Sequence, residues 1–278
     1  MSLSVEKVTR GTGSGKRQPR ALDPFLWGAT GVLCFWGLWE LAALATGNDA
    51  VLPGPRVVLW EFQHGFQGDR GLEYLGIRQS GYVVNLAWTV GTAAGAWLIG
   101  STLGILAGLA SARRQWLRDV TEPVLFVFGA VPVLVAAPLF LVWFGAGPLS
   151  KLALVTFYCF VVVGVVAQSA ALNIPPTTEE YAATLGLDNK ARFRAVVLPS
   201  AFPPIVAVLR LALATGISLE ASAELLGSRA GVGRLIAVRA QQGNVGAVLA
   251  LAIALGLVAL VLDVLIRAAV APVLRWQG

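Results

Sequence analysis

Long apolar stretches alternate with short polar segments along most of this chain. Each apolar stretch has about 20 or more residues, which is enough for a tilted helix to cross ~30 Å of hydrocarbon. The pattern predicts membrane-spanning helices at residues 25–46, 82–110, 120–145, 149–173, 201–226 and 246–272. We therefore expect an all-α fold, a polytopic membrane bundle of about six transmembrane helices in one domain that covers residues 25–278.

Two polar segments have a character of their own. Residues 1–24 are basic and lack the short apolar core and cleavage site of a signal peptide, so we expect a disordered cytoplasmic tail. Residues 55–62 begin with Pro55 and are apolar at most later positions, which predicts a short amphipathic helix on the outer membrane face. An ordered loop is the alternative for that second segment.

Composition supports a membrane protein and excludes several other classes. Residues with hydrophobic side chains make up 56% of the chain and charged residues 13%, and the mean hydropathy is +0.73. A lipid bilayer is the natural solvent for such a chain. The net charge of +6 is spread over the polar segments without a basic stripe and interleaved aromatics, so no nucleic-acid partner is expected.

The distribution of Lys and Arg predicts the orientation. If the N-terminus is inside, the inner segments hold thirteen basic residues and the outer segments hold seven. Positive residues are retained on the cytoplasmic side of short connections. We expect a multi-pass protein of the bacterial plasma (inner) membrane with both termini in the cytoplasm.

No catalytic or metal-binding arrangement is visible. Cys34 and Cys159 lie in apolar runs, where buried inert thiols are expected, and His64 is the single histidine. Residues 11–16 resemble the end of a phosphate-binding loop, but Arg17 stands where Ser or Thr is required. We expect no enzyme activity, no cofactor and no metal in this chain.

The predicted second span carries glycines at spacings of four or five residues. They give one smooth helical face, which favours close helix packing over a substrate site. The residues concerned are Gly91, Gly95, Gly100, Gly104 and Gly108.

The segment at residues 175–200 is polar but organised like two short helices. Thr177 and Glu180 have the spacing of a capping box, and Gly186 is of the type that ends a helix in the left-handed conformation. Asp188 or Asn189 is suited to cap a second helix, which leads back into the membrane. The pattern predicts a cytoplasmic helix-glycine-helix elbow.

This elbow resembles the EAA loop of binding-protein-dependent ABC transporter permeases. Glu180, Ala182 and Gly186, followed by Leu198-Pro199, match the spacing of that loop, whereas Tyr181 departs from it. Further similarity to the subgroup that imports nitrate, sulfonates, taurine or bicarbonate extends over about residues 50–275. It is carried by residues 52–55 (LPGP), 138–147 (PLFLVWFGAG), 223–224 (AE) and 231–236 (GVGRLI).

The resemblance implies a type I ABC importer permease that moves a small anion inward. In that family the elbow docks on a cytoplasmic ATPase and transmits its closure to the adjoining spans. The implied partners are two ATPase subunits that bind ATP and Mg, a second permease copy, most simply an identical one, and an extracytoplasmic solute-binding protein. The implied coupling residues are Glu180, Tyr181, Ala182, Ala183, Gly186, Leu198 and Pro199.

Polar residues and prolines within the spans are candidates for a substrate pathway or a gate. Glu220 and Glu224 lie on one helical face, and a carboxylate in a span is costly unless it is paired or wet. They either contact solute, gate the pore, or pair with a cation such as Arg210, Arg229 or Arg234. Pro132 and Pro138 either free carbonyls toward a cavity or only shape the helix.

Two alternatives remain for the function. An ion-coupled secondary transporter would show inverted repeats and broken midplane helices, and a membrane enzyme would need a polar catalytic cluster. Neither signature is visible in the sequence.

Asp263 in the last predicted span is expected to pair with Arg267, one helical turn further on.

Overall fold

A computed structural model describes residues 23–66, 68 and 81–272 of the chain. These residues form helices and connecting segments, and no strand occurs among them, so the all-α prediction is confirmed. The elements are α1 (Asp23–Thr46), α2 (Pro55–Gly65), α4 (Tyr82–Arg113), α5 (Gln115–Ala130), α6 (Val133–Phe144), α7 (Pro148–Leu172), α8 (Pro176–Thr184), α9 (Asn189–Arg192), the π-helical segment η1 (Phe193–Val197), α10 (Leu198–Leu225), α11 (Val232–Gln241) and α12 (Val245–Val270). Residues 1–22 of the predicted tail (residues 1–24) lie outside the described residues.

The centre of the bundle is the contact between α4 and α7. A methyl group added at Gly104 would lie 2.7 Å from the carbonyl oxygen of Phe160, and one added at Gly108 would lie 2.5 Å from that of Gly164. Gly100 approaches the backbone of α7 in the same way, whereas Gly91 and Gly95 face no atom within 4 Å. The predicted glycine packing is thus confirmed for the second half of α4, where it brings two backbones together as membrane helices require.

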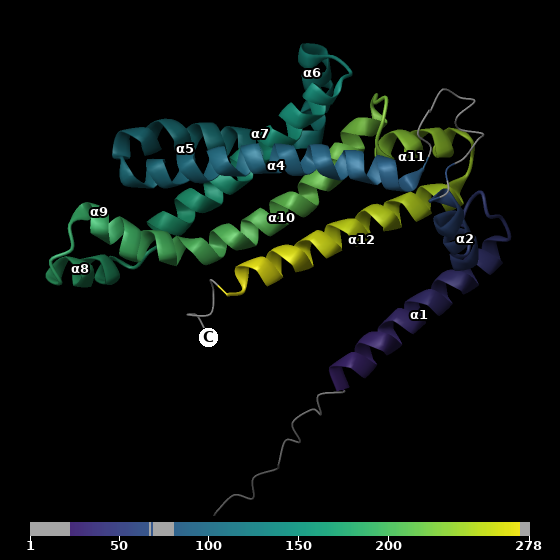
Figure 1. Cartoon of the computed structure of the whole chain (residues 1–278), viewed down its shortest axis with the longest axis horizontal. Coiled ribbons are helices and arrows are strands. Elements are labelled where there is room, and N and C mark those ends of the chain that lie inside the picture. Colours follow the sequence, from purple (N-terminus) through teal and green to yellow (C-terminus); the bar gives the residue numbers. More distant parts are fainter. Residues whose placement is uncertain (1–22, 67, 69–80, 273–278) are drawn as a thin grey trace, which may run out of the picture.

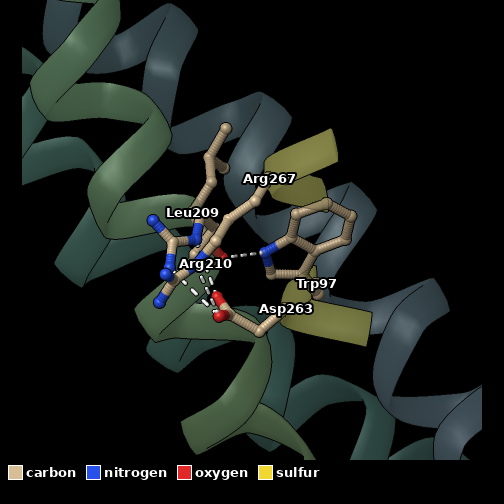
Figure 2. Close-up of polar contacts among 5 residues, drawn as sticks. All are labelled: Trp97, Leu209, Arg210, Asp263 and Arg267. Atoms are coloured by element: carbon tan, nitrogen blue, oxygen red, sulfur yellow. Dashed lines mark hydrogen bonds and ion pairs between the residues drawn. The ribbon is translucent and has the colours of Figure 1, made fainter. Parts of the chain in front are cut away.

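A hydrogen bond joins α4 to α10, and an ion pair joins α12 to α10, within the apolar bundle (Figure 2). The indole of Trp97 on α4 donates a hydrogen bond of 2.9 Å to the carbonyl oxygen of Leu209. The guanidinium of Arg210 on α10 pairs with Asp263 on α12, with 2.7 Å between Nε and Oδ1. Arg267 also pairs with Asp263 at 2.9 Å, which confirms the expected intrahelical pair and adds a partner that the sequence did not assign.

The stretch predicted as a single third span, residues 120–145, contains a sharp break. Helices α5 and α6 meet at an angle of 99°, around the extended backbone of Val131 and Pro132. A residue before proline avoids helical geometry, and proline itself has no N–H to continue a helix, so Pro132 ends α5 and begins α6. Pro138, in contrast, lies inside α6. The model accordingly has five long apolar helices, or six if this bent pair counts as one crossing.

The polar segments gather at two opposite ends of the bundle (Figure 1). At one end, α8 and α9 lie beside the connection from α4 to α5. At the other end, α11 and α2 lie near the start of α12. The elbow and the connection from α4 to α5, both predicted to be inner, thus lie at one end, and the predicted outer segments that contain α2 and α11 lie at the other.

Helix α1 extends from the bundle, whereas α2 packs against the first part of α12 (Figure 1). The predicted amphipathic helix exists as α2, and its Glu61 accepts a hydrogen bond of 2.8 Å from the amide of Asn244 at the start of α12. Helix α1 contacts mainly α2, so its side chains are largely exposed. Cys34 is therefore exposed, contrary to the expectation of two buried thiols, whereas Cys159 is buried between helices.

Candidate functional site

The first helix of the elbow begins earlier than the capping box predicts. Helix α8 starts at Pro176 with Pro175 as its N-cap, and no side chain caps it. Proline is well suited to the first helical turn because its fixed φ is already helical and its missing N–H is not needed there. Thr177 thus lies inside the helix, and Glu180 is an exposed residue of its middle and not a cap.

Gly186 ends α8 as predicted. Its φ is +78°, a left-handed conformation that costs any residue with a Cβ atom. The N–H of Gly186 donates to the carbonyl oxygen of Ala183 at 3.0 Å, and that of Leu187 donates to Ala182 at 3.3 Å. These two bonds make a Schellman motif, which fixes the direction in which the chain leaves the helix.

The second half of the elbow is continuous with a membrane-spanning helix. Asp188 caps α9 by accepting a hydrogen bond of 2.6 Å from the N–H of Ala191, as the sequence allows. The helix then passes through η1 into α10, where Pro199 lies in the first turn. Proline has no N–H to donate, so a local widening to π-helical bonds fits this position. The helical backbone therefore runs without a break from α9 into α10.

The elbow is also tied to α4 and divides into an inner and an outer face. The guanidinium of Arg113, the last residue of α4, lies 4.2 Å from the ring centre of Phe193. Ala182 is buried, so its small side chain serves packing within the elbow and is not available to a partner. Among the exposed residues of this part are Glu180, Tyr181 and Ala183 on α8 and its C-cap residue Leu185, and we call these four the elbow face.

The elbow face carries two large exposed side chains with apolar surface. Tyr181 is 68% exposed and Leu185 is 65% exposed, at an end of the bundle rich in charged residues. They lie four residues apart and thus on one side of α8. Leu198 and Pro199 lie after η1, where Leu198 is exposed and Pro199 is half-buried.

At the opposite end, Glu220 and Glu224 are fully buried and are not paired with an arginine. Glu220 accepts a hydrogen bond of 2.9 Å from the hydroxyl of Thr92. Glu224 accepts bonds from the hydroxyl of Thr89 at 2.9 and 3.0 Å and from the N–H of Gly233 at 2.8 Å. Of the cations considered from the sequence, Arg210 binds Asp263 instead.

The carboxyl group of Glu224 holds the start of α11 against α4 and α10. Thr89 also accepts a bond of 2.9 Å from the N–H of Val232, and the amide oxygen of Asn85 accepts one of 2.8 Å from Gly231. Three successive N–H groups at the helix start are therefore satisfied by buried side chains. This arrangement explains the glycines of the GVG motif, since side chains at Gly231 or Gly233 would collide with Glu224 or Ala221.

Comparison with known protein families identifies the group to which this arrangement belongs. Residues 100–274, from the middle of α4 to the end of the described chain, match the model of the family described as "Binding-protein-dependent transport system inner membrane component". The chain belongs to this family. It is a membrane permease component of ABC transporters, as the resemblance of the elbow indicated, and the family is not a catalytic one.

Relatives of the permease agree with the subgroup suggested by the sequence motifs. The taurine transport system permease protein TauC of Escherichia coli is 27% identical over 89% of this chain and 87% of its own length. The putative aliphatic sulfonates transport permease protein SsuC of Bacillus subtilis is 27% identical over 87% and 84%. The formylaminopyrimidine transport permease protein ThiX of Halalkalibacterium halodurans is 25% identical over 78% and 81%.

A solved structure supports the fold of the permease. A chain from an inward-facing structure of the MetNI methionine ABC transporter superposes with a TM-score of 0.57 at 18% identity. The superposition covers 76% of this chain and 99% of that one. The similarity confirms a type I ABC importer permease fold for the bundle.

Sequence reasoning missed the polar partners of the buried carboxyl groups in the permease. Thr89, Thr92 and Asn85 are dispersed in an apolar helix and carry no recognisable spacing with the glutamates more than 120 residues away. Lys151 was counted as part of an outer segment, but it is only 3% exposed. In the described part of the permease, no group of three or more potential metal ligands occurs.

Proposed function

We propose that the elbow face is the surface on which a separate ATPase docks, and that two such ATPases, with ATP and Mg bound in them, drive the transporter. The chain itself is the permease subunit of an ABC importer for small solutes. The observation that carries this proposal is the exposure of Tyr181 and Leu185 on a helix fixed at its end by the Schellman motif. A rigid element that continues into α10 conveys a movement that a flexible loop would absorb.

The same proposal covers the rest of the assembly. A second copy of this chain completes the translocation pathway, and an extracytoplasmic binding protein delivers the solute at the end where α11 and α6 lie. The elbow and both termini are in the cytoplasm, and the membrane is the bacterial inner membrane. The gathering of the predicted inner segments at one end of the bundle supports this orientation.

The proposed solute is a small anion such as nitrate, bicarbonate, taurine or another sulfonate. Relatives named for taurine and aliphatic sulfonates support this class, whereas the relative named for formylaminopyrimidine has a heterocyclic solute. The burial of Glu220 and Glu224 supports it as well. Three of their four oxygens accept hydrogen bonds from Thr89, Thr92 or Gly233, and neither carboxyl group lines the cleft at that end of the bundle, so the two glutamates need not repel an anion there.

Co-purification and transport test the proposal together. The tagged permease, extracted in mild detergent, is expected to retain its ATPases and, reconstituted with the binding protein, to accumulate solute only with ATP. Replacement of Tyr181 and Leu185 by serine should reduce ATPase retention about tenfold or more, since buried aromatic and aliphatic anchors dominate such interfaces. Replacement of exposed Leu44 on α1 by serine is the matched control. Full retention by the elbow variant would refute the docking surface.

A further inference from the structure

A cleft at the α11 end of the bundle is lined by cations. Its volume is about 670 Å³, within the range of small-molecule sites. Lys151 comes from the first turn of α7, Arg229 from the connection after α10, and Arg234 from the first turn of α11. Trp88 of α4 lines the same cleft, as do Gly227 and Ser228.

The three cations are not neutralised by carboxylates in the cleft. No ion pair joins any of them to an acidic side chain among residues 23–66, 68 and 81–272. The ammonium of Lys151, although 97% of the residue is buried, contacts only the carbonyl oxygens of Gly147 at 3.1 Å and Ala146 at 3.5 Å. The ammonium thus bonds directly only to neutral carbonyl oxygens, and Glu220 and Glu224 offset its charge only in part, so a ligand of opposite charge would be stabilised there.

Helix geometry adds to this positive field. Lys151 and Arg234 both lie in the first turns of their helices, where the helix dipole already contributes partial positive charge. Cations are normally disfavoured at such positions, because the helix dipole repels them. An oxyanion between α7 and α11 would offset both the dipoles and the side-chain charges.

The acidic groups nearest to the cleft lie behind it. Glu220 and Glu224 are close enough to interact electrostatically with Lys151, and they offset part of its charge. Oε1 of Glu220 accepts a bond from Thr92, and both oxygens of Glu224 accept bonds from Thr89 or Gly233, whereas Oε2 of Glu220 has no hydrogen-bond partner among the described residues. Neither glutamate lines the cleft, so three cations face it against no carboxylate.

We propose that this cleft binds a small oxyanion, a carboxylate-, nitrate- or sulfonate-sized group, through Lys151 and Arg234, with Arg229 at the mouth. This inference rests on the proposed function and assigns its solute a site at the entrance of the permease. The oxyanion accepts charge-assisted hydrogen bonds from the ammonium and the guanidinium, while Trp88 forms an apolar wall. The solute thus meets positive charge before it reaches the apolar part of the bundle.

Calorimetric titration of the full complex in nanodiscs, without binding protein, tests the site. The probes are taurine, nitrate and bicarbonate at constant ionic strength, with choline as the cationic control. At least one anion should bind saturably and choline should not. Lys151→Met and Arg234→Gln should each weaken binding about tenfold or more, as expected when a hydrogen bond to a charged group is lost. Arg56→Gln, on the exposed side of α2, should change the Kd by less than about twofold.

The remaining outcomes overturn the inference. They are the absence of saturable anion binding, an unchanged Kd in both cleft variants, or an equal loss in the Arg56 variant. If the cleft variants instead weaken only the docking of unliganded binding protein, the cations contact an acidic partner surface and not the solute. Arg229→Gln, at an exposed position, replaces any buried variant that fails to fold. Co-purification of the ATPases is scored separately, so the site can fail while the importer proposal stands.

Discussion

Glu224 on α10 accepts a hydrogen bond of 2.8 Å from the backbone N–H of Gly233 on α11, across a contact that only glycine allows. The same carboxyl group accepts bonds from Thr89 on α4, so one buried side chain fixes three helices at the end opposite the elbow. Glu224, which the sequence offers as a gate or a solute ligand, thus has a structural role at that end of the bundle.

Glu224→Ala should lower the free energy of unfolding by about 2–4 kcal/mol, because it leaves the N–H of Gly233 without a partner and opens a cavity. The measurement is unfolding of the detergent-solubilised permease by SDS titration. Glu180→Ala, an exposed substitution on α8, should change the value by less than about 0.5 kcal/mol. Equal effects of the two substitutions would argue against the hydrogen-bond network.

Gly186→Val should uncouple transport from ATP hydrolysis. A β-branched residue at φ +78° is strained, so the Schellman motif would break and α8 would lose its fixed direction. Solute uptake by reconstituted vesicles should fall about tenfold or more, while the melting temperature of the bundle changes little. Gly28→Val on α1, where nothing lies within 4 Å of the added atom, is the control. Normal uptake by the Gly186 variant would exclude a coupling role for the turn.

Substitutions of two glycines on α4 should act in opposite directions. At Gly104 the added methyl group would press on the backbone of α7, with 2.7 Å to the oxygen of Phe160, and overpacking of this kind costs about 1–3 kcal/mol. At Gly95 the added methyl group meets open space in the single chain, and alanine favours a helix by up to about 1 kcal/mol. Thermal melts of Gly104→Ala and Gly95→Ala compare them. If Gly95→Ala were destabilising and Gly104→Ala were not, the close contact between α4 and α7 at Gly104 would be refuted.

The pair of Arg210 and Asp263 should show coupling in a double-mutant cycle. Asp263→Leu leaves Arg210 without a counter-charge within the bundle, whereas Arg210→Leu leaves Asp263 paired with Arg267. We therefore expect the Asp263 variant to be the less stable of the two, and the double variant to be more stable than the sum of the two single effects implies. Unfolding by SDS titration gives all four values. Strict additivity would show that the 2.7 Å contact does not persist in the membrane protein.

The elbow shows which structural features can be predicted from neighbouring residues and which cannot. Gly186 and Asp188 were assigned correctly because a left-handed turn and a helix cap depend on a few neighbouring residues. The capping box failed because Pro175 and Pro176 start the helix earlier than Thr177 does. The sequence did not show which of Ala182 and Ala183 is exposed, because exposure depends on how α8 packs against the rest of the elbow.

The sequence by itself determined the spans, the all-α class, the elbow and the family, because hydrophobic length, helix ends and motif spacing are properties of adjacent residues. Only the tertiary structure decided the partners of the buried polar groups. Glu224 meets Thr89, Arg210 meets Asp263, and Lys151 joins Arg234 in one cleft. Each of these contacts joins helices that are distant in the chain, and their meeting depends on how the glycine faces and the break at Pro132 orient whole helices. No local pattern encodes that orientation.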